Sequence, residues 1–345
     1  MHGGDIYRNS IRFDFSVNLN PLGVPPEVQW VLTEAALHAN KYPDIIHENL
    51  VRATSEIFDI SSENIVYGNG ASELIMAICH SVNPGSALLL SPCFSGYETC
   101  IKGAAPNCKI SYHTLLEEND FELHHDFVEK IQVEKPDLVF ITNPNNPNGK
   151  LIDGDLLLDI IDICEAVGTT LVVDECFLPL TGREKEYSLA YNIEKRKSLI
   201  VLRAFTKTYS IPGVRLGYAV CSKINIAEGL KQHLPEWNIS IFAQMAGAEC
   251  LKHTDYIEQS VRTIDEERRF LSEGLKKLGV KVYGSDVNFI LFKCKNFELK
   301  EELLEYSILI RDCSDYNGLE RGFYRVAVKL HNENEGLLSA LGDLL

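Results

Sequence analysis

Short apolar runs alternate with longer amphipathic segments between about residue 46 and residue 235, and this alternation restricts the fold of the 345-residue chain more than any other feature. Several runs are apolar throughout rather than at every second position, as the buried strands of a parallel sheet are. Strands that alternate with helices are typical of α/β folds. The expected strands span 65–67, 87–90, 138–142, 170–174, 198–203 and 217–221, and the expected helices include 71–82, 155–167 and 223–234.

The two ends of the chain show a different pattern, in which helices precede a group of strands. The expected helices span 26–39, 241–278 with a break near 253–255, and 333–344, and the expected strands span 288–292, 307–310 and 324–328. We expect the N-terminal arm and the C-terminal third to pack together as a second, smaller domain. The predicted division is 1–45 for the arm, 46–237 for the large domain and 238–345 for the small domain.

The composition excludes several classes of protein. A formal charge of −16 makes a nucleic-acid surface a poor expectation, although a few arginines can still form a positive pocket for an anionic substrate. The ten cysteines contain no CxxC pair, so neither a disulfide framework nor a metal site is expected. No apolar stretch approaches the roughly 20 residues that span a bilayer, and the first residues lack the apolar region of a signal peptide. We therefore expect a cytoplasmic protein that binds neither nucleic acid nor membrane.

Two charged residues directly follow or end apolar strands. Lys207 stands after one strand in a run that is otherwise poor in charge, and Arg215 follows eight residues later. A lysine in a desolvated pocket near other cations has a lowered pKa, and its neutral amine can attack an aldehyde. Asp174 ends another strand, where a carboxylate needs a partner such as a protonated pyridine nitrogen. Taken singly, Lys207 could be a surface lysine, and Asp174 could belong to a salt bridge or a helix cap.

Three further motifs also stand at strand ends. Asn146 lies in TNPNNPNG, whose Asn, Pro and Gly residues force a turned backbone that can fix an amide side chain. The segment 68–73 (GNGASE) opens a helix, and the first amides of a helix can bind an anion such as a phosphate. Phe94 follows a third strand and could stack on a planar cofactor. Taken singly, these motifs could be a structural turn, an ordinary loop and a core aromatic.

Together the motifs are far less ambiguous than each is alone. The ends of five strands supply, in chain order, a phosphate-binding helix start, an aromatic ring, an amide, a carboxylate and a lysine followed by an arginine. A planar pyridinium aldehyde with a phosphate tail requires these contacts. Over nearly the whole chain, their order and local sequences resemble the fold-type I pyridoxal 5'-phosphate (PLP) enzymes of the class I/II aminotransferase group. The resemblance implies the PLP-dependent transferase fold, with a mostly parallel sheet flanked by helices in a large domain and a smaller α+β domain.

The resemblance also implies a role for each motif. Lys207 would be the catalytic residue and would form a Schiff base with PLP. Phe94 would stack on the ring, Asn146 would contact its O3' and Asp174 would pair with its nitrogen. Tyr42, in KYPD, would reach the phosphate bound by the neighbouring subunit, which implies a homodimer with shared active sites. The cofactor phosphate itself would be bound by Gly70, Ala71, Ser72, Thr206 and Arg215.

Two positions depart from the family pattern. Members of the group usually carry a hydroxyl residue three positions before the lysine, where this chain has Ala204. Many aminotransferases place a tyrosine that bonds O3' three positions after the aspartate, where this chain has Phe177. We therefore expect one hydroxyl fewer at the phosphate and altered electronics of the Schiff base, which fits a member that does not transaminate.

The first and last segments resemble the threonine-phosphate decarboxylases of cobalamin synthesis, with the histidinol-phosphate aminotransferases as the next likeness. HGGDIY and FDFSVNLNPLG look like the opening of the decarboxylases, in which an HGG element and an Asn contact the substrate. ILIRDCSDYNGL and FYRVAV also look like the decarboxylases and carry a pair of arginines for the substrate anions. From its position alone, HGG could be a plain N-terminal arm. The implied substrate-binding residues are His2, Gly3, Asn18, Asn146, Arg311 and Arg325.

These resemblances predict PLP-dependent decarboxylation of L-threonine O-3-phosphate, a small phosphorylated amino acid, to (R)-1-amino-2-propanol phosphate, as in cobalamin biosynthesis. L-serine O-phosphate is a neighbouring possibility, because a pocket discriminates one methyl group by only about 1–3 kcal/mol. An aminotransferase of the histidinol-phosphate type is the alternative on the same fold and cofactor. A non-catalytic regulator of this fold is a third possibility, although such proteins usually carry a fused DNA-binding segment for which we see no room.

Overall fold

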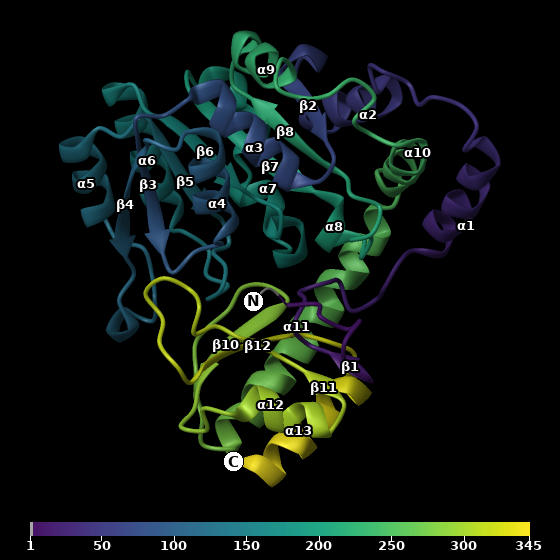
Figure 1. Cartoon of the computed structure of the whole chain (residues 1–345), viewed down its shortest axis with the longest axis vertical. Helices are drawn as coiled ribbons and strands as arrows, with labels where there is room; N and C mark the ends of the chain where they lie inside the picture. The colour runs from purple at the N-terminus through teal and green to yellow at the C-terminus, as the bar shows by residue number, and fades with distance from the viewer. Residues whose placement is uncertain (1–2) are drawn as a thin grey trace.

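The computed structural model describes residues 3–345, and its main feature is a seven-stranded sheet in the order β2-β8-β7-β6-β5-β3-β4 (Figure 1). Neighbouring strands are parallel except for β8, which runs antiparallel to both β2 and β7. In sheet order the strands are Ile65–Gly68, Gly217–Cys221, Leu199–Ala204, Thr170–Asp174, Leu138–Thr142, Ser86–Ser91 and Lys109–Thr114. The predicted α/β class with a mostly parallel sheet is confirmed.

Helices cover both faces of this sheet, and each face has its own hydrophobic core. Because both faces are buried, strands such as β5 and β8 consist of buried residues throughout, which is why they read as continuous apolar runs. The helices on one face are α3 (Ala71–Val82), α4 (Gly96–Ala104) and α9 (Ile224–Lys231). Those on the other face are α1 (Pro26–Ala35), α2 (Glu48–Phe58), α5 (Asp126–Glu134), α6 (Gly154–Val167) and α10 (Ile241–Cys250).

A smaller antiparallel sheet, β12-β13-β10-β9, lies beyond one edge of the large sheet, and the long helix α11 runs from one sheet towards the other (Figure 1). The N-terminal arm joins this smaller layer, since β1 pairs in parallel with β11 and Phe15 is fully buried in the same core. The predicted domain boundaries stay predictions. The elements are β1 (Phe13–Asp14), α11 (Thr254–Lys277), β9 (Lys281–Val282), β10 (Phe289–Lys293), α12 (Leu299–Glu305), β11 (Ile308–Leu309), β12 (Arg311–Asp312), β13 (Phe323–Ala327) and α13 (His331–Leu344).

The sequence predicted the buried elements well and missed several partly exposed ones. Three strands and α3 have the expected bounds, and the helix break expected near 253–255 lies slightly earlier, at 251–253, between α10 and α11. The helix expected at 26–39 ends earlier, at Ala35, and continues as a short 3-10 turn. The edge strand β4 was not predicted, because its half-buried sequence KISYHT contains no apolar run; helices α2, α4 and α5 were also missed. Within residues 3–345, no helix is both long and apolar enough to cross a membrane.

Candidate active site

The carboxyl ends of β2, β3, β5, β6 and β7 lie at one edge of the large sheet, because these strands run in the same direction. Strand β8 runs the other way, so its first residue, Gly217, lies at this edge between Gly68 and Ala204. A cavity of about 260 Å³ opens there. The predicted site residues that line it are Gly3, Asn18, Ala71, Ser72, Phe94, Asn146, Asp174, Thr206, Lys207, Arg215, Arg311 and Arg325.

Lys207 stands in the short helix α8 (Phe205–Thr208), which follows β7 directly, and its side chain lines the cavity. Burial, and after it the positive charge of Arg325, lower the pKa of its ammonium group from 10.5 to about 8. Arg215 acts in the same direction, whereas the Cys176 thiol and the Asp174 carboxylate oppose it. More of Lys207 is therefore neutral near neutral pH than of an exposed lysine, and the neutral amine is the form that attacks aldehydes.

The lowered pKa of Lys207 predicts how the apoprotein reacts with PLP. The rate of covalent attachment should rise with pH and level off above about 8, which stopped-flow absorbance at the Schiff-base band would measure. Between about 8 and the ordinary value of 10.5 the unfolded chain holds more protons at this residue, so the apoprotein should also gain stability as pH rises through that window. An attachment rate that keeps climbing up to pH 10.5 would contradict the burial of Lys207.

The start of α3 and Arg215 form the phosphate-binding part of the predicted site. Gly70 precedes the helix with φ +78°, and a Cβ on it would stand 2.6 Å from Nη2 of Arg215. Only glycine therefore permits this backbone to approach the guanidinium so closely. The free amides of the first helical turn and the Arg215 cation suit a phosphate. Thr206 adds a buried hydroxyl, whereas Ala204, which also lines the cavity, adds none.

Gly217 keeps strand β8 in close contact with the start of α3. A Cβ at this position would meet the backbone nitrogen of Ala71 at 2.8 Å and the carbonyl oxygen of Arg203 at 2.9 Å, and neither backbone atom can rotate away. We expect Gly217→Ala to lower the free energy of unfolding by about 1–3 kcal/mol, the usual cost of overpacking, and to weaken PLP retention. Gly213→Ala is the control, because a Cβ there meets no atom within 4 Å. Equal PLP retention by the two variants in equilibrium dialysis would contradict the prediction.

A buried hydrogen-bond network holds Asp174 at the end of β6. Tyr97, from α4, donates its hydroxyl to Oδ2 of Asp174 over 2.7 Å, and its oxygen lies 2.8 Å from Oγ1 of Thr142. The backbone amide of Cys176 donates to Oδ1 of the same carboxylate over 3.0 Å. The Phe94 ring packs edge-on against Tyr97, with ring centroids 5.4 Å apart. Sequence reasoning missed Tyr97 and Thr142; the available signal was that a tyrosine follows Phe94 by three residues at the start of a helix.

Arg311 and Arg325 stand directly opposite each other on the paired strands β12 and β13. Like charges in this arrangement are destabilising, so the pair favours an anion beside it. Arg325 is 6% exposed and donates to the carbonyl oxygen of Ser16 over 3.1 Å and to Oδ1 of Asn146. Its Nε has no hydrogen-bond partner among residues 3–345. Arg311 forms an ion pair with Asp315 at 2.6 Å. The two guanidinium groups, of which one is paired with Asp315, therefore present net buried positive charge to an anionic ligand.

The N-terminal arm also lines the cavity, through Gly3 and Asn18. A Cβ on Gly3 would stand 2.4 Å from the carbonyl oxygen of Ser16, so only glycine fits there. Asn18 is buried, and its Oδ1 finds no partner within the described part of the chain, which leaves that atom for a ligand. Tyr316, which sequence reasoning missed, also lines the cavity and donates to Oδ1 of Asn146 over 3.3 Å, so Asn146 can offer its amide nitrogen to a ligand.

Two predicted site residues within the described range, Gly70 and Tyr42, do not line the cavity. Gly70 has no side chain to contribute and lies against the guanidinium of Arg215. Tyr42 is 81% exposed and packs against Trp237, with ring centroids 5.0 Å apart. Its predicted contact with a neighbouring subunit stays a prediction. His2 lies outside the described residues.

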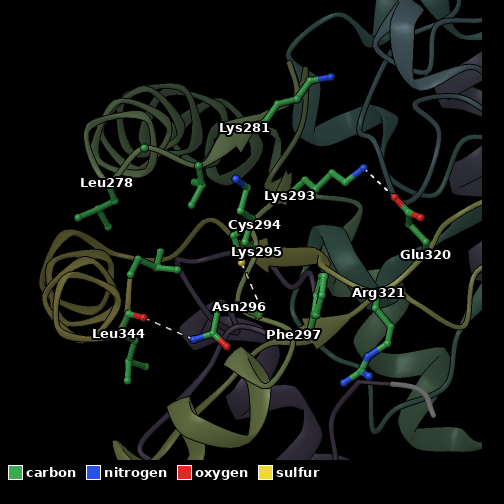
Figure 2. Close-up of a pocket in the computed structure, with 13 residues that line it drawn as sticks. Leu278, Lys281, Lys293, Cys294, Lys295, Asn296, Phe297, Glu320, Arg321 and Leu344 are labelled. Carbon is green, nitrogen blue, oxygen red and sulfur yellow. Dashed lines mark hydrogen bonds and ion pairs between the residues drawn. The ribbon is translucent and has the colours of Figure 1, made fainter.

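A second hollow, of about 860 Å³, lies in the C-terminal layer and is shown in Figure 2. It is lined by residues 278–281, 293–297, 320–321 and 344–345, and none of the predicted site residues is among them. Lys293 points towards Glu320 and is ion-paired with it at 2.9 Å, and it pairs with Glu117 at the same distance. Its charge is thus already balanced. The residues with reactive or ligand-binding chemistry gather instead at the edge of the large sheet.

The side chains at that edge fit PLP. Lys207 offers an amine of lowered pKa for the aldehyde, Asp174 offers a carboxylate for the ring nitrogen, and Phe94 offers an aromatic face. The start of α3 offers amides for the phosphate, and Nε of Arg325, which has no partner within residues 3–345, leaves a buried donor for a substrate anion. Fold and site together define the class as PLP-dependent enzymes of fold type I.

The family follows from the sequence match. The model for the family described as aminotransferase class I and II matches residues 10–341, and the chain belongs to this PLP-dependent family. It is 35% identical to the putative threonine-phosphate decarboxylase of Caldanaerobacter subterraneus subsp. tengcongensis, over 99% of this chain and 93% of that protein. It is 33% identical to the histidinol-phosphate aminotransferase of the same organism, over 97% of this chain and 93% of that protein.

Two further relatives show how closely the fold matches a solved structure and how the chain compares in length with a longer protein. The histidinol-phosphate aminotransferase structure from Clostridium acetobutylicum superposes with a TM-score of 0.89 at 32% identity, covering 96% of this chain and 98% of that one. The chain is 32% identical, over 99% of its length, to the adenosylcobalamin biosynthesis bifunctional protein CobDQ of Leptospira interrogans, of which it spans 41%. Decarboxylases and aminotransferases thus stand at similar identity to this chain.

Proposed function

We propose that this chain is a PLP-dependent carboxy-lyase that converts L-threonine O-3-phosphate to (R)-1-amino-2-propanol phosphate. The observation that carries the proposal is that Gly3 and Asn18 of the N-terminal arm line the same cavity as Arg311 and Arg325. These residues come from the segments on which the resemblance to the decarboxylases rested. Relatives named threonine-phosphate decarboxylase, at 35% and 31% identity, support it.

Each side chain has a defined task in this proposal. Arg311 and Arg325 hold the phosphate and the carboxylate of the substrate, because guanidinium groups bind both anions in bidentate geometry. When bound, PLP supplies an electron sink that weakens whichever Cα bond stands perpendicular to its ring. By holding these two anions, the arginines orient the substrate so that the bond from Cα to the carboxylate is the one that is weakened. Asp174 keeps negative charge beside the ring nitrogen, and Lys207 delivers a proton to Cα after CO₂ leaves.

Phe177 supports a reaction other than transamination. It lines the cavity, is 6% exposed and packs edge-on against Phe289, with ring centroids 5.1 Å apart. Many aminotransferases of the group carry a tyrosine at this position, and a phenylalanine cannot donate a hydrogen bond to O3'. The electronics of the bound cofactor should therefore differ from those of the aminotransferases.

The alternative is an aminotransferase of the histidinol-phosphate type, which the structural likeness at a TM-score of 0.89 favours. One assay separates the two. The purified enzyme with PLP should release CO₂ from L-threonine O-3-phosphate without 2-oxoglutarate. If it instead transfers an amino group from histidinol phosphate to 2-oxoglutarate and releases no CO₂, the decarboxylase proposal is wrong. L-serine O-phosphate in the same assay tests how strongly the site discriminates the methyl group of the substrate, and heat-denatured protein supplies the blank.

We also propose a homodimer in which Tyr42 reaches the neighbouring subunit's phosphate site. Tyr42 is among several exposed hydrophobic side chains of the segment 30–46, which include Trp30, Leu37 and Ile46. Mixed dimers test the arrangement. A Lys207→Ala chain combined with a Tyr42→Ala chain rebuilds one complete site only if the tyrosine acts across the interface. Activity of the mixture that does not exceed the sum of the two parent variants would contradict shared sites.

A further inference from the structure

Tyr97 is a buried polar side chain of the cavity to which the proposed chemistry gives no role. It is 0% exposed, and its ring stacks on Phe140 with centroids 4.8 Å apart and planes 10° apart. Its hydroxyl lies 2.7 Å from Oδ2 of Asp174 and 2.8 Å from Oγ1 of Thr142. A tyrosine has one hydroxyl proton, so when it donates to the carboxylate, Thr142 must donate to the tyrosine oxygen. The hydrogen bonds therefore run in one direction, from Thr142 through Tyr97 to Asp174.

The sheet fixes the geometry of this chain of donors. Thr142 and Asp174 are register partners at the carboxyl ends of β5 and β6. Phe140 precedes Thr142 by two residues and so presents its side chain on the same face of the sheet. The stack on Phe140 sets the plane of the Tyr97 ring. Burial, and after it the charge of Asp174, raise the pKa of the Tyr97 hydroxyl well above its usual value, so it stays a donor.

We propose that Tyr97 is a positioning residue that fixes the direction and the charge of the Asp174 carboxylate towards the PLP ring nitrogen. The inference rests on the proposed role of Asp174. With Oδ2 held by Tyr97 and Oδ1 held by the Cys176 amide, the carboxylate cannot rotate without losing a buried hydrogen bond. Both hydrogen bonds come from neutral groups, so neither donor neutralises the charge of the carboxylate. The full negative charge of Asp174 therefore stays available to a cationic ring.

Tyr97→Phe tests this inference, because it keeps the stacked ring and removes only the hydroxyl. The readout is the ¹⁵N chemical shift of the ring nitrogen in holoenzyme loaded with ¹⁵N-labelled PLP, which distinguishes the protonated from the neutral pyridine. We expect a shift towards the neutral pyridine value. We also expect kcat to fall about 10–100-fold, the scale of removing an outer-shell partner, with KM changed less than about threefold. Thr142→Val should produce a smaller change in the same direction.

Two controls keep the outcomes distinguishable. Tyr324→Phe removes another buried tyrosine hydroxyl, which donates to the carbonyl oxygen of Asn296 over 3.0 Å in the C-terminal layer, and it should leave the ¹⁵N shift unchanged. If Asp174→Asn changes the shift and Tyr97→Phe does not, the inference about Tyr97 is overturned. If Asp174→Asn also leaves the shift unchanged, the proposed role of Asp174 fails first. Should Tyr97→Phe not fold, the same comparison is made with Thr142→Val.

Discussion

Lys207→Ala should abolish covalent attachment of PLP and reduce turnover by at least about 10³-fold, the scale of losing a positioned proton-transfer group. The variant should lack the visible absorption band of the Schiff base. In the parent protein, borohydride reduction followed by peptide mapping should place the cofactor on Lys207. Binding of PLP itself should weaken less than turnover does, because the start of α3, Arg215 and Asp174 are unchanged.

The matched control for this prediction is Lys231→Ala, since Lys231 is an exposed lysine at the end of α9, which packs on the large sheet. It should keep both the absorption band and full turnover. A Lys207→Ala protein that stays yellow and active would refute the assignment of the nucleophile, and the peptide map would then show which amine carries the cofactor.

Arg325→Ala should raise the KM for the phosphorylated substrate by about 30-fold or more, while the affinity for PLP changes little. Truncation of one partner of a buried, hydrogen-bonded charge pair costs about 2–5 kcal/mol, which corresponds to this range. In addition, Ser16 and Asn146 lose the guanidinium that bridges the arm to the sheet edge. Substrate saturation curves and PLP titrations of the same preparation measure the two effects.

Arg321→Ala is the matched control for this second prediction. Arg321 lies four residues earlier, its side chain is 64% exposed, and it is ion-paired with Glu298, so its loss should leave KM unchanged. Equal losses of substrate and cofactor affinity in Arg325→Ala would count against a substrate-specific role. A raised KM in Arg321→Ala as well would point to a general electrostatic effect instead of a contact.

The residues at strand ends could be predicted because the pattern that marks a buried strand also marks where it stops. Asp174 and Asn146 were recognisable as polar groups that follow apolar runs, and the structure brings both to one cavity. Tyr97 and Tyr316 could not be recognised in this way, because they come from a helix and a loop, where an aromatic residue is more often part of the core. Strand β4 was not predicted for a related reason, since an edge strand with one exposed side lacks a continuous apolar run.

The sequence could not predict that Arg311 and Arg325 stand directly opposite each other on paired strands. Both were predicted to bind anions, but the register of two antiparallel strands joined by a long connection depends on the turn geometry between them. A slip of one residue would have pointed one guanidinium to the other face of the sheet. The structure shows the two arginines as direct partners, which concentrates their charge in a single place.

The reversal of β8 has a consequence for how the protein keeps its cofactor. Since β8 returns beside β7, the one connection 205–216 carries both the amine that would anchor the aldehyde and the guanidinium that would anchor the phosphate. Opening of this connection would displace the groups that anchor both ends of the cofactor at once, and a bound cofactor would hold the connection closed. Occupancy by the cofactor and the stability of this connection are therefore expected to be coupled, and amide exchange in 205–216 should slow as occupancy rises.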